Sequence, residues 1–463
     1  MTVFLYGPPA SGKTTLGRRL ASAIGGEFTD LDETIVAAAG KPIPEIFAES
    51  GEAVFRKLES QALEQVSAAV GKFAKCVVAL GGGTLLDEKN RALCERVGSV
   101  ICLEAPSADE LKRRLEKDGR SRPLGDKSVE RAAHYASFPA RLAASFDLGN
   151  SLVLVGRAIA PTFLEGLPCV VDENVRRLHG ERLSRVVDVI PSGESHKTIA
   201  TVTGIWQSLA KAGLGRRDTV AAVGGGVTGD LTGFAAATFM RGISWVNVPT
   251  TLLSMVDAST GGKTGCDLDE GKNLVGAFHA PQLVVVDVDF LSTLTPELIA
   301  EGRAEMIKHE LVGGRLGCRE LTAAALARNL AIKIGIVRED PFERTGRRLL
   351  LNCGHTIAHA VEKCSNYAIS HGAAVAIGCV AEAWIAARLR LTAADWPERL
   401  ARVFADEGLP TELPSGMNLA MLVPVMKGDK KRHGDVVTFA LPCGWGDVRA
   451  VRIDLSKEVG IWS

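Results

Sequence analysis

The sequence lacks a net charge. Its 54 basic residues equal its 54 acidic residues in number. Because no global field then attracts a polyanion or an anionic membrane surface, we expect small-molecule partners, with no nucleic acid and no membrane among them. Local basic pockets remain compatible with small anionic ligands.

Paired cysteines and long apolar runs are also missing. The ten cysteines include no CxxC pair, and Cys76 and Cys102 lie in apolar, strand-like runs, which predicts reduced, buried thiols. No apolar run reaches the roughly 18 residues that a membrane span needs. The N-terminal residues do not show the pattern of a signal peptide. We therefore expect a cytoplasmic protein.

No repeat and no Pro-rich or Gly/Ser-rich tether divides the 463 residues, so the domain organisation rests on hydrophobic patterning. Residues 1–148 alternate short apolar runs with helical stretches, which predicts a parallel α/β sheet. Residues 151–290 repeat this alternation, whereas residues 292–430 are mostly helical in pattern. The sequence predicts an α/β fold with a domain at 1–150, an α/β half at 151–291 and an α-helical half at 292–463.

A phosphate-binding motif follows the first apolar run. The segment GPPASGKTT matches G-x-x-x-x-G-K-[ST]. Backbone N–H groups of such a turn surround phosphate oxygens, while Lys13 can reach the terminal phosphates and the Thr14 hydroxyl can bind magnesium. We expect ATP and magnesium to bind at Gly7, Gly12, Lys13, Thr14, Thr15 and Asp30.

Further segments indicate what accepts the phosphate. In DLD at 30–32, Asp30 can serve the magnesium shell and Asp32 an acceptor hydroxyl. Arg56 in FRKLE offers a bidentate clamp for a carboxylate. In LGGGT at 80–84, Gly82 and Gly83 allow backbone N–H groups to approach a small ligand.

With these segments and RPL at 122–124, residues 1–148 resemble shikimate kinase. The resemblance implies a P-loop kinase that phosphorylates the 3-hydroxyl of shikimate with ATP and magnesium. Lys13 and Asp32 would be catalytic, and Arg122 would close over the phosphates. Shikimate would be held by Asp32, Arg56, Gly82 and Gly83.

One family feature is missing from this part. The family's second carboxylate-binding arginine is replaced by Tyr135 in YASFP. Either Arg131 or Arg141 takes its place, or shikimate binds more weakly. An alternative is therefore a regulatory nucleotide-binding module without strong catalysis.

The next part contains another glycine-rich turn. AVGGGVTGDLTGF at 222–234 suits a pyrophosphate at a helix N-terminus, although a simple tight turn explains it equally well. Asp230 and the hydroxyls of PTTLL at 249–253 add groups suited to a dinucleotide. Lysines gather in the segments that follow, around Lys263, Lys272 and Lys308, which indicates a phosphorylated or carboxylated substrate.

Three of the nine histidines lie close together in the sequence. His355 and His359 share one face of a predicted helix, and His371 begins another segment. Glu305 can add an oxygen ligand. Three protein ligands with an open position describe a catalytic zinc site.

Together these motifs make residues 151–463 resemble 3-dehydroquinate synthase. The resemblance implies NAD- and metal-dependent conversion of 3-deoxy-D-arabino-heptulosonate 7-phosphate to 3-dehydroquinate and phosphate. It implies zinc or cobalt on Glu305, His355 and His371, and it assigns His359 to substrate phosphate. An iron- or zinc-dependent polyol dehydrogenase, whose reaction would release NADH, is the alternative.

The resemblance also implies roles for further residues. NAD would contact Asp172, Asn174, Glu194, Lys197, Gly225, Gly226, Asp230, Thr250, Thr251 and Lys272. Substrate would contact Lys263, Asn273, Lys333, Arg348, Asn352, His359, Lys431 and, from a neighbouring subunit, Arg241, which implies a homodimer or larger homo-oligomer. The catalytic residues would be Asp257, Lys263, Lys308 and His359.

Overall fold

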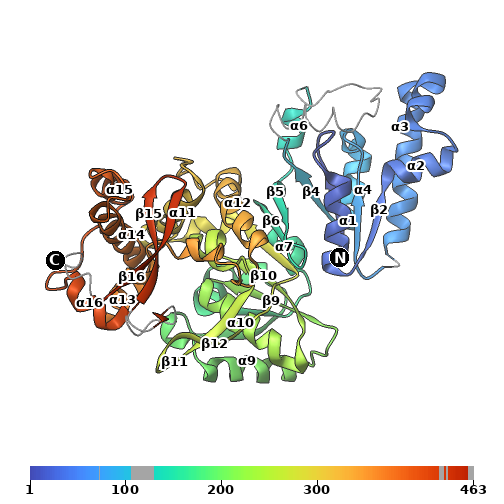
Figure 1. The fold of residues 1–463 in the computed structure, drawn as a ribbon. Helices are drawn as coiled ribbons and strands as arrows, with labels where there is room; N and C mark the ends of the chain where they lie inside the picture. Colours follow the sequence, from blue (N-terminus) through green and yellow to red (C-terminus); the bar gives the residue numbers. More distant parts are fainter. Residues whose placement is uncertain (72, 106–129, 427–431, 434–435, 457–463) are drawn as a thin grey trace. The chain divides into compact units, whose positions relative to one another are not determined.

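The computed structural model describes residues 1–71, 73–105, 130–426, 432–433 and 436–456 (Figure 1). Two compact units are present. The first comprises Met1–Val223, Leu231–Val248 and Ala280–Asp289, and the second comprises Gly224–Asp230, Pro249–His279 and Phe290–Ser463. The expected α/β class is confirmed, with a large, mainly parallel sheet and a helical C-terminal part.

Within the described residues, one sheet has eleven strands in the order β2-β3-β1-β4-β5-β6-β13-β10-β9-β7-β8. Most of its strands are continuous buried apolar runs, as expected for parallel strands that are covered on both faces. The strands are β1 (Thr2–Tyr6), β2 (Glu27–Asp30), β3 (Cys76–Ala79), β4 (Ser99–Leu103), β5 (Arg141–Asp147), β6 (Leu152–Arg157), β7 (Cys169–Asp172), β8 (Val186–Ile190), β9 (Thr219–Gly224), β10 (Ser244–Pro249) and β13 (Leu283–Asp287).

Helices alternate with these strands, as the hydrophobic pattern predicts. They are α1 (Lys13–Ile24), α2 (Leu31–Ala39), α3 (Ile43–Val70), α4 (Glu88–Val97), α6 (Ala132–Ala136), α7 (Ala160–Leu164), α8 (Glu173–His179), α9 (Ile199–Lys211) and α10 (Gly226–Thr238). Helix α1 packs against β3, and α3 contributes Leu63 to a core that includes Phe4 and Val78.

The antiparallel pair β5–β6 joins the first part of the sheet to the rest. Its register runs from Arg141 opposite Arg157 to Asp147 opposite Leu152. The expected boundary between residues 150 and 151 therefore lies in the turn of a hairpin. The boundaries at 150 and 291 stay predictions.

The second unit is mainly helical. Its helices are α11 (Pro296–Gly313), α12 (Ala323–Glu339), α13 (His355–Cys364), α14 (His371–Arg388), α15 (Trp396–Ala405) and α16 (Leu419–Met426). Helix α14 packs against α11, α13, α15 and β15, so it is the central helix of this core.

Small residues allow this close packing of helices. Gly378 on α14 lies so near to α13 that a Cβ there would be 2.1 Å from the carbonyl oxygen of Gly354. Any other residue at 378 would push the first turn of α13 away from α14.

Strands also occur in the second unit, which the sequence did not predict. They form a two-stranded sheet of β11 (Lys263–Leu268) and β12 (Gly271–Phe278), and a three-stranded sheet of β14 (Arg432–His433), β15 (Val436–Gly444) and β16 (Asp447–Asp454).

All ten cysteines are free thiols, and Cys76 and Cys102 are buried as expected. In the part of the chain that the structure describes, no helix combines the length and the apolar character that a bilayer crossing requires.

Candidate functional site

The phosphate-binding turn of the first unit lies between β1 and α1. Gly7 has a φ of 137°, and a Cβ there would be 2.6 Å from the carbonyl oxygen of Leu103, so only glycine fits this turn. Lys13 Nζ donates to the carbonyl oxygens of Gly7 and Pro8 at 2.8 Å each. The ammonium group thus lies over the turn where phosphate oxygens would bind.

The predicted magnesium ligands are already in contact. Thr14 Oγ1 donates to Asp30 Oδ2 at 2.7 Å, although the two residues are 16 positions apart. Asp30 also caps α2, because its Oδ1 accepts from the backbone N–H of Asp32 at 3.0 Å. A hydroxyl and a carboxylate beside a phosphate turn are oxygen ligands that suit magnesium.

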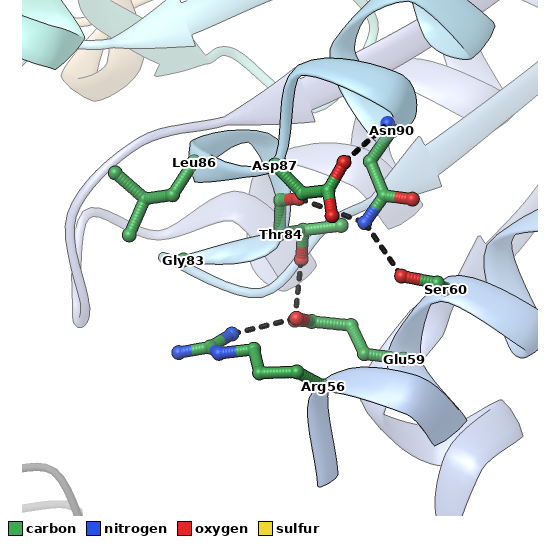
Figure 2. Close-up of a pocket in the computed structure, with 8 residues that line it drawn as sticks. All are labelled: Arg56, Glu59, Ser60, Gly83, Thr84, Leu86, Asp87 and Asn90. Carbon is green, nitrogen blue, oxygen red and sulfur yellow. Dashed lines mark hydrogen bonds and ion pairs between the residues drawn. The ribbon is translucent and has the colours of Figure 1, made fainter. Parts of the chain in front are cut away.

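A cavity of about 220 Å³ lies beside Arg56 and Gly83 (Figure 2). Arg56 Nη1 is 2.6 Å from Glu59 Oε2, and the buried Glu59 accepts from Thr84 Oγ1 at 2.6 Å through its other oxygen. The Glu59 carboxylate therefore holds the guanidinium of Arg56 in place. The two residues are three positions apart on one helix, which allows this contact. Two of the predicted shikimate residues, Arg56 and Gly83, line this cavity.

The carbonyl oxygen of Gly82 accepts hydrogen bonds from three side chains. Tyr135 Oη donates to it at 2.7 Å, Tyr6 Oη at 3.3 Å and Arg131 Nη1 at 3.4 Å. Arg131 therefore lies at the glycine loop, whereas Arg141 belongs to strand β5. Arg122, the expected lid arginine, lies outside the described residues.

In the second unit, the predicted metal ligands converge. One ligand atom each from Glu305, His355 and His371 lies within 4.8 Å of the others. Glu305 Oε1 is 3.6 Å from His355 Nε2 and 3.3 Å from His371 Nε2. The three residues come from α11 and from the first positions of α13 and α14.

The residues fit a divalent cation. Glu305 is fully buried, and neither of its oxygens accepts a hydrogen bond of good geometry from the described residues, although Lys308 Nζ forms an ion pair with Oε2. A buried carboxylate oxygen that faces two imidazoles provides, with their ring nitrogens, the donor set of a catalytic zinc site. The arrangement of oxygen and nitrogen ligands also suits cobalt.

The charge states of the three residues agree with this fit. Burial raises the pKa of Glu305, but Lys308, His371 and His355 together outweigh burial, and the pKa falls below its usual range. Burial and then Lys308 lower the pKa of His355, which keeps its imidazole neutral. Burial lowers the pKa of His371, but Glu305 and Glu362 outweigh it and raise the pKa to about 10. A metal-ligating histidine must be a neutral imidazole, so binding of a cation would release the proton of His371.

Glu362 is a site residue that the sequence analysis missed. Its Oε1 lies 3.6 Å from His371 Nδ1 and 3.1 Å from Lys272 Nζ. A carboxylate on the second ring nitrogen of a metal-ligating histidine orients the ring and raises its basicity. Glu362 lies on α13, and only the fold brings it next to His371, so no local motif could have found it.

Glu382 has a similar supporting position. This fully buried residue on α14 accepts from the backbone N–H groups of Gly354 at 2.8 Å and Ile357 at 3.3 Å. The carboxylate caps the first turn of α13, where His355 begins the helix. Glu382 therefore holds His355 in place through the backbone.

A second group of charges surrounds Asp257, which lies in the π-helix Ser254–Ala258. Its Oδ1 is 2.8 Å from Lys333 Nζ and 3.6 Å from Lys308 Nζ. Burial raises the pKa of Asp257, but the two lysines outweigh it and lower the pKa well below its usual range. Burial lowers the pKa of Lys333 to about 8, although Asp257 opposes this shift.

Arg348 is buried beside the turn that follows Asp257. Its Nη1 donates to the carbonyl oxygens of Gly261 at 3.3 Å and Pro341 at 2.9 Å. Gly261 has a φ of 109°, and a Cβ there would be 2.2 Å from Arg348 Nη2. The glycine pair in STGGK therefore makes room for the guanidinium.

The remaining predicted substrate residues are less closely joined. Lys263 Nζ forms an ion pair with Glu343 Oε1 at 2.6 Å. The ring of His359 lies 5.4 Å from that of His355 between centroids, on the same helix. Asn273 is in β12, Asn352 ends the 3₁₀-helix Arg348–Asn352, and Lys431 lies outside the described residues.

The predicted NAD residues divide between the two units. Asp172, Asn174, Glu194 and Lys197 belong to the first unit, where Asp172 caps α8 and Lys197 Nζ lies 4.0 Å from Glu194 Oε1. In the second unit, the backbone N–H of Thr250 donates to the carbonyl oxygen of Gly224 at 2.9 Å. This hydrogen bond joins the PTTLL segment to the glycine-rich turn. The others in this unit are Gly225, Gly226, Asp230, Thr251 and Lys272.

Arg241 lies in the exposed turn Phe239–Arg241. Both Met240 and Arg241 have positive φ angles, 51° and 67°, which non-glycine residues rarely adopt. The side chain of Met240 is also exposed.

Family models match most of the chain. Residues 9–144 match shikimate kinase, residues 187–301 match the N-terminal part of 3-dehydroquinate synthase, and residues 302–432 match its C-terminal part. The synthase matches favour the synthase prediction over a polyol dehydrogenase.

Individual proteins agree with the family models. The chain is 42% identical to a 3-dehydroquinate synthase of Synechococcus sp. over 305 residues, which are 60% of this chain and 83% of that protein. It is 40% identical to the 3-dehydroquinate synthase of Symbiobacterium thermophilum over 317 residues, 63% of this chain and 88% of that protein.

Solved structures share the fold of the synthase part. A 2-epi-5-epi-valiolone synthase from Streptomyces hygroscopicus, with NAD⁺ and Zn²⁺ bound, aligns with a TM-score of 0.59 at 26% identity, over 69% of this chain and 97% of that one. A 2-deoxy-scyllo-inosose synthase complexed with carbaglucose-6-phosphate, NAD⁺ and Co²⁺ aligns with a TM-score of 0.61 at 24% identity, over 69% and 99%.

Both expected resemblances are thereby confirmed. The chain belongs to the 3-dehydroquinate synthase family and carries a shikimate kinase domain before the synthase, so it is a bifunctional enzyme of the shikimate pathway.

Proposed function

We propose that Glu305, His355 and His371 hold the divalent cation of the synthase reaction. The observation that carries this proposal is the buried Glu305 carboxylate: its Oε1 faces both imidazoles and accepts no hydrogen bond of good geometry from the described residues. The zinc and cobalt named for two structures of similar fold support the same choice of metal. Zinc is the first candidate.

The cofactors supply the chemistry that the side chains lack: NAD takes and returns a hydride, and the cation stabilises charge on an oxygen of the substrate. The residues of this chain position the substrate. Protonated Lys333 and Arg348 provide positive charge for its carboxylate, while Asp257 accepts a hydrogen bond from a ring hydroxyl. Lys308 stays protonated between Glu305 and Asp257 and keeps both carboxylates ionised.

The phosphate of the substrate requires a separate group of donors. We assign it to Lys263, Asn273, Asn352 and His359, with Lys431 outside the described residues and Arg241 from a second subunit. Lys263 forms an ion pair with Glu343 in the structure, so the substrate phosphate must replace the Glu343 carboxylate when it binds to Lys263. A homodimer or larger homo-oligomer in the cytoplasm follows as part of the proposal.

For the kinase, we propose that Asp32 accepts the proton of the shikimate hydroxyl and that Arg56 binds the shikimate carboxylate. The Glu59–Arg56 ion pair supports this role, because it presents the guanidinium in a fixed orientation beside the cavity. Thr14 and Asp30 would hold magnesium, and Lys13 would bind the terminal phosphates.

A weakly catalytic, regulatory kinase domain is the second candidate, because Tyr135 occupies the position of an arginine. Arg131 argues against it, since its guanidinium already reaches Gly82.

Assays of the full-length protein test both parts. Zinc-loaded protein with NAD should release phosphate from 3-deoxy-D-arabino-heptulosonate 7-phosphate without net NADH. The same preparation should release ADP from ATP only when shikimate is present. Net NADH would contradict the synthase proposal, and shikimate-independent or absent ADP release would contradict the kinase proposal.

A further inference from the structure

A buried histidine that has no assigned role contacts Asp257. His309 lies on α11 and is fully buried. Its Nε2 is 3.1 Å from Asp257 Oδ1, and its Nδ1 is 2.8 Å from Oδ1 of the equally buried Asn329 on α12. The histidine therefore bridges two side chains from different elements.

The neighbours of His309 decide where its protons are. Asn329 Nδ2 donates to the carbonyl oxygen of Met306 at 2.9 Å, which turns the amide oxygen towards His309. Because that oxygen only accepts, Nδ1 of His309 carries a proton. Nε2 faces a carboxylate oxygen, and two lone pairs at 3.1 Å would repel each other, so Nε2 also donates. The ring is thus held at both ends.

The contacts of Asp257 are all on one side of its carboxylate. Lys333, Lys308 and His309 each approach Oδ1. Lys333 Nζ also donates to the backbone carbonyl oxygen of Asp257. Among the described residues, no hydrogen bond or ion pair is made through Oδ2, and the side chain retains an exposed fraction of 23%. The carboxylate is fixed through one oxygen and open to a ligand through the other.

A second metal does not explain this cluster. Ligand atoms of Asp257, Glu305 and His309 lie within 4.8 Å of one another, which is a spacing that a cation could use. However, the ammonium groups of Lys308 and Lys333 already approach the same Asp257 oxygen. A divalent cation there would meet two positive charges in a buried site.

We propose that His309, held by Asn329, is a positioning residue that orients Asp257 so that Oδ2 faces a hydroxyl of the synthase substrate. This inference rests on the proposed role of Asp257. Nε2–H of His309 prevents rotation of the carboxylate about its Cβ–Cγ bond, and Asn329 prevents rotation of the imidazole. Neither residue touches the substrate.

The test uses the zinc-loaded full-length protein and the release of phosphate from 3-deoxy-D-arabino-heptulosonate 7-phosphate. His309→Phe keeps a ring of similar size but removes both donors, and we expect kcat to fall about 100-fold with little change in KM, because misplacement of a reacting group by about 1 Å costs this much. His309→Gln retains an N–H donor for Asp257, so its kcat should be at least about tenfold higher than that of His309→Phe.

A double-mutant cycle separates positioning from packing. If His309 acts through Asp257, adding His309→Phe to Asp257→Asn should change kcat by less than about threefold. A full additional loss in the double variant, equal losses in His309→Phe and His309→Gln, or wild-type kcat in His309→Phe would each overturn the proposal.

Zinc content and thermal stability serve as folding controls. If His309→Phe does not fold, Asn329→Leu replaces it: kcat should fall about tenfold, and a kcat equal to that of the unchanged protein would overturn the proposal. Failure of the unchanged protein to release phosphate would instead contradict the proposed function itself, so the two failures are distinguishable.

Discussion

The phosphate-binding turn of the first unit and the predicted metal site of the second are built in opposite ways. We call the metal site, formed by Glu305, His355 and His371, the ion cluster. The phosphate site uses backbone groups of one continuous segment, and Gly7 and Lys13 are six residues apart. The ion cluster uses buried side chains from helices that are distant in the sequence, such as Glu305 on α11 and His371 on α14. A local turn tolerates change elsewhere in the chain, whereas a buried cluster depends on every charge that surrounds it.

The largest expected effect on activity comes from removing a metal ligand of the ion cluster. Glu305→Ala should lower synthase kcat roughly 10⁴-fold, because the cation contributes several kcal/mol of charge stabilisation. Bound zinc should disappear from the purified protein, as measured by metal analysis. Kinase activity of the same preparation is the control and should stay within about twofold. Retained stoichiometric zinc would show that Glu305 is not a ligand.

In the first unit, Asp32→Asn should lower kinase kcat roughly 10³-fold, because the amide cannot accept the proton of shikimate. The variant keeps the backbone N–H that Asp30 caps, and thermal denaturation serves as the folding control. Coupled ADP release measures the effect. Full kinase activity would contradict the proposed role and favour a different base.

A change beside the cluster should have a moderate effect. Glu362→Gln removes the charge that faces His371 Nδ1, and zinc affinity should fall about 10- to 100-fold in competition with a chelator. The matched control is Glu339→Gln, which removes an exposed carboxylate paired with Arg347. Equal zinc affinity in both variants would exclude a supporting role for Glu362.

The two arginines that could replace the missing family arginine, Arg131 and Arg141, allow a sharper comparison. Arg131→Gln should raise KM for shikimate about tenfold, because a charge-assisted contact with the carboxylate is lost. Arg141→Gln is the matched control and should change KM less than about twofold. The reverse order would assign the carboxylate to Arg141.

The smallest effect concerns pH. Lys333 has a pKa of about 8, so it is charged below this pH and becomes neutral above it. KM for the anionic synthase substrate should therefore rise about threefold between pH 7.5 and 8.5. Lys333→Arg keeps the charge and should remove this rise. A rise that persists in Lys333→Arg would show that another group titrates.

The same contrast explains what the sequence could predict. The P-loop motif is local, so Gly7, Lys13 and Thr14 could be assigned from spacing. Strands such as β7, β9, β10 and β13 are apolar runs and were expected, whereas the half-exposed β11, β12 and β16 lack that pattern and were missed.

The ion cluster was predictable only in part. Spacing alone pairs His355 with His359, because residues four apart share a helix face. The structure instead gathers His355 with His371 and Glu305, as the family resemblance implies. Supporting residues such as Glu362 and His309 have no sequence signature, since their role arises from packing between helices.

The location of the cation tests the account most directly. A crystal structure of the zinc-loaded protein, with anomalous diffraction measured at the zinc edge, should show one strong peak about 2.0–2.2 Å from the ligand atoms of Glu305, His355 and His371. No peak at these residues in zinc-loaded crystals, or a peak at Asp257 and His309 instead, would contradict it.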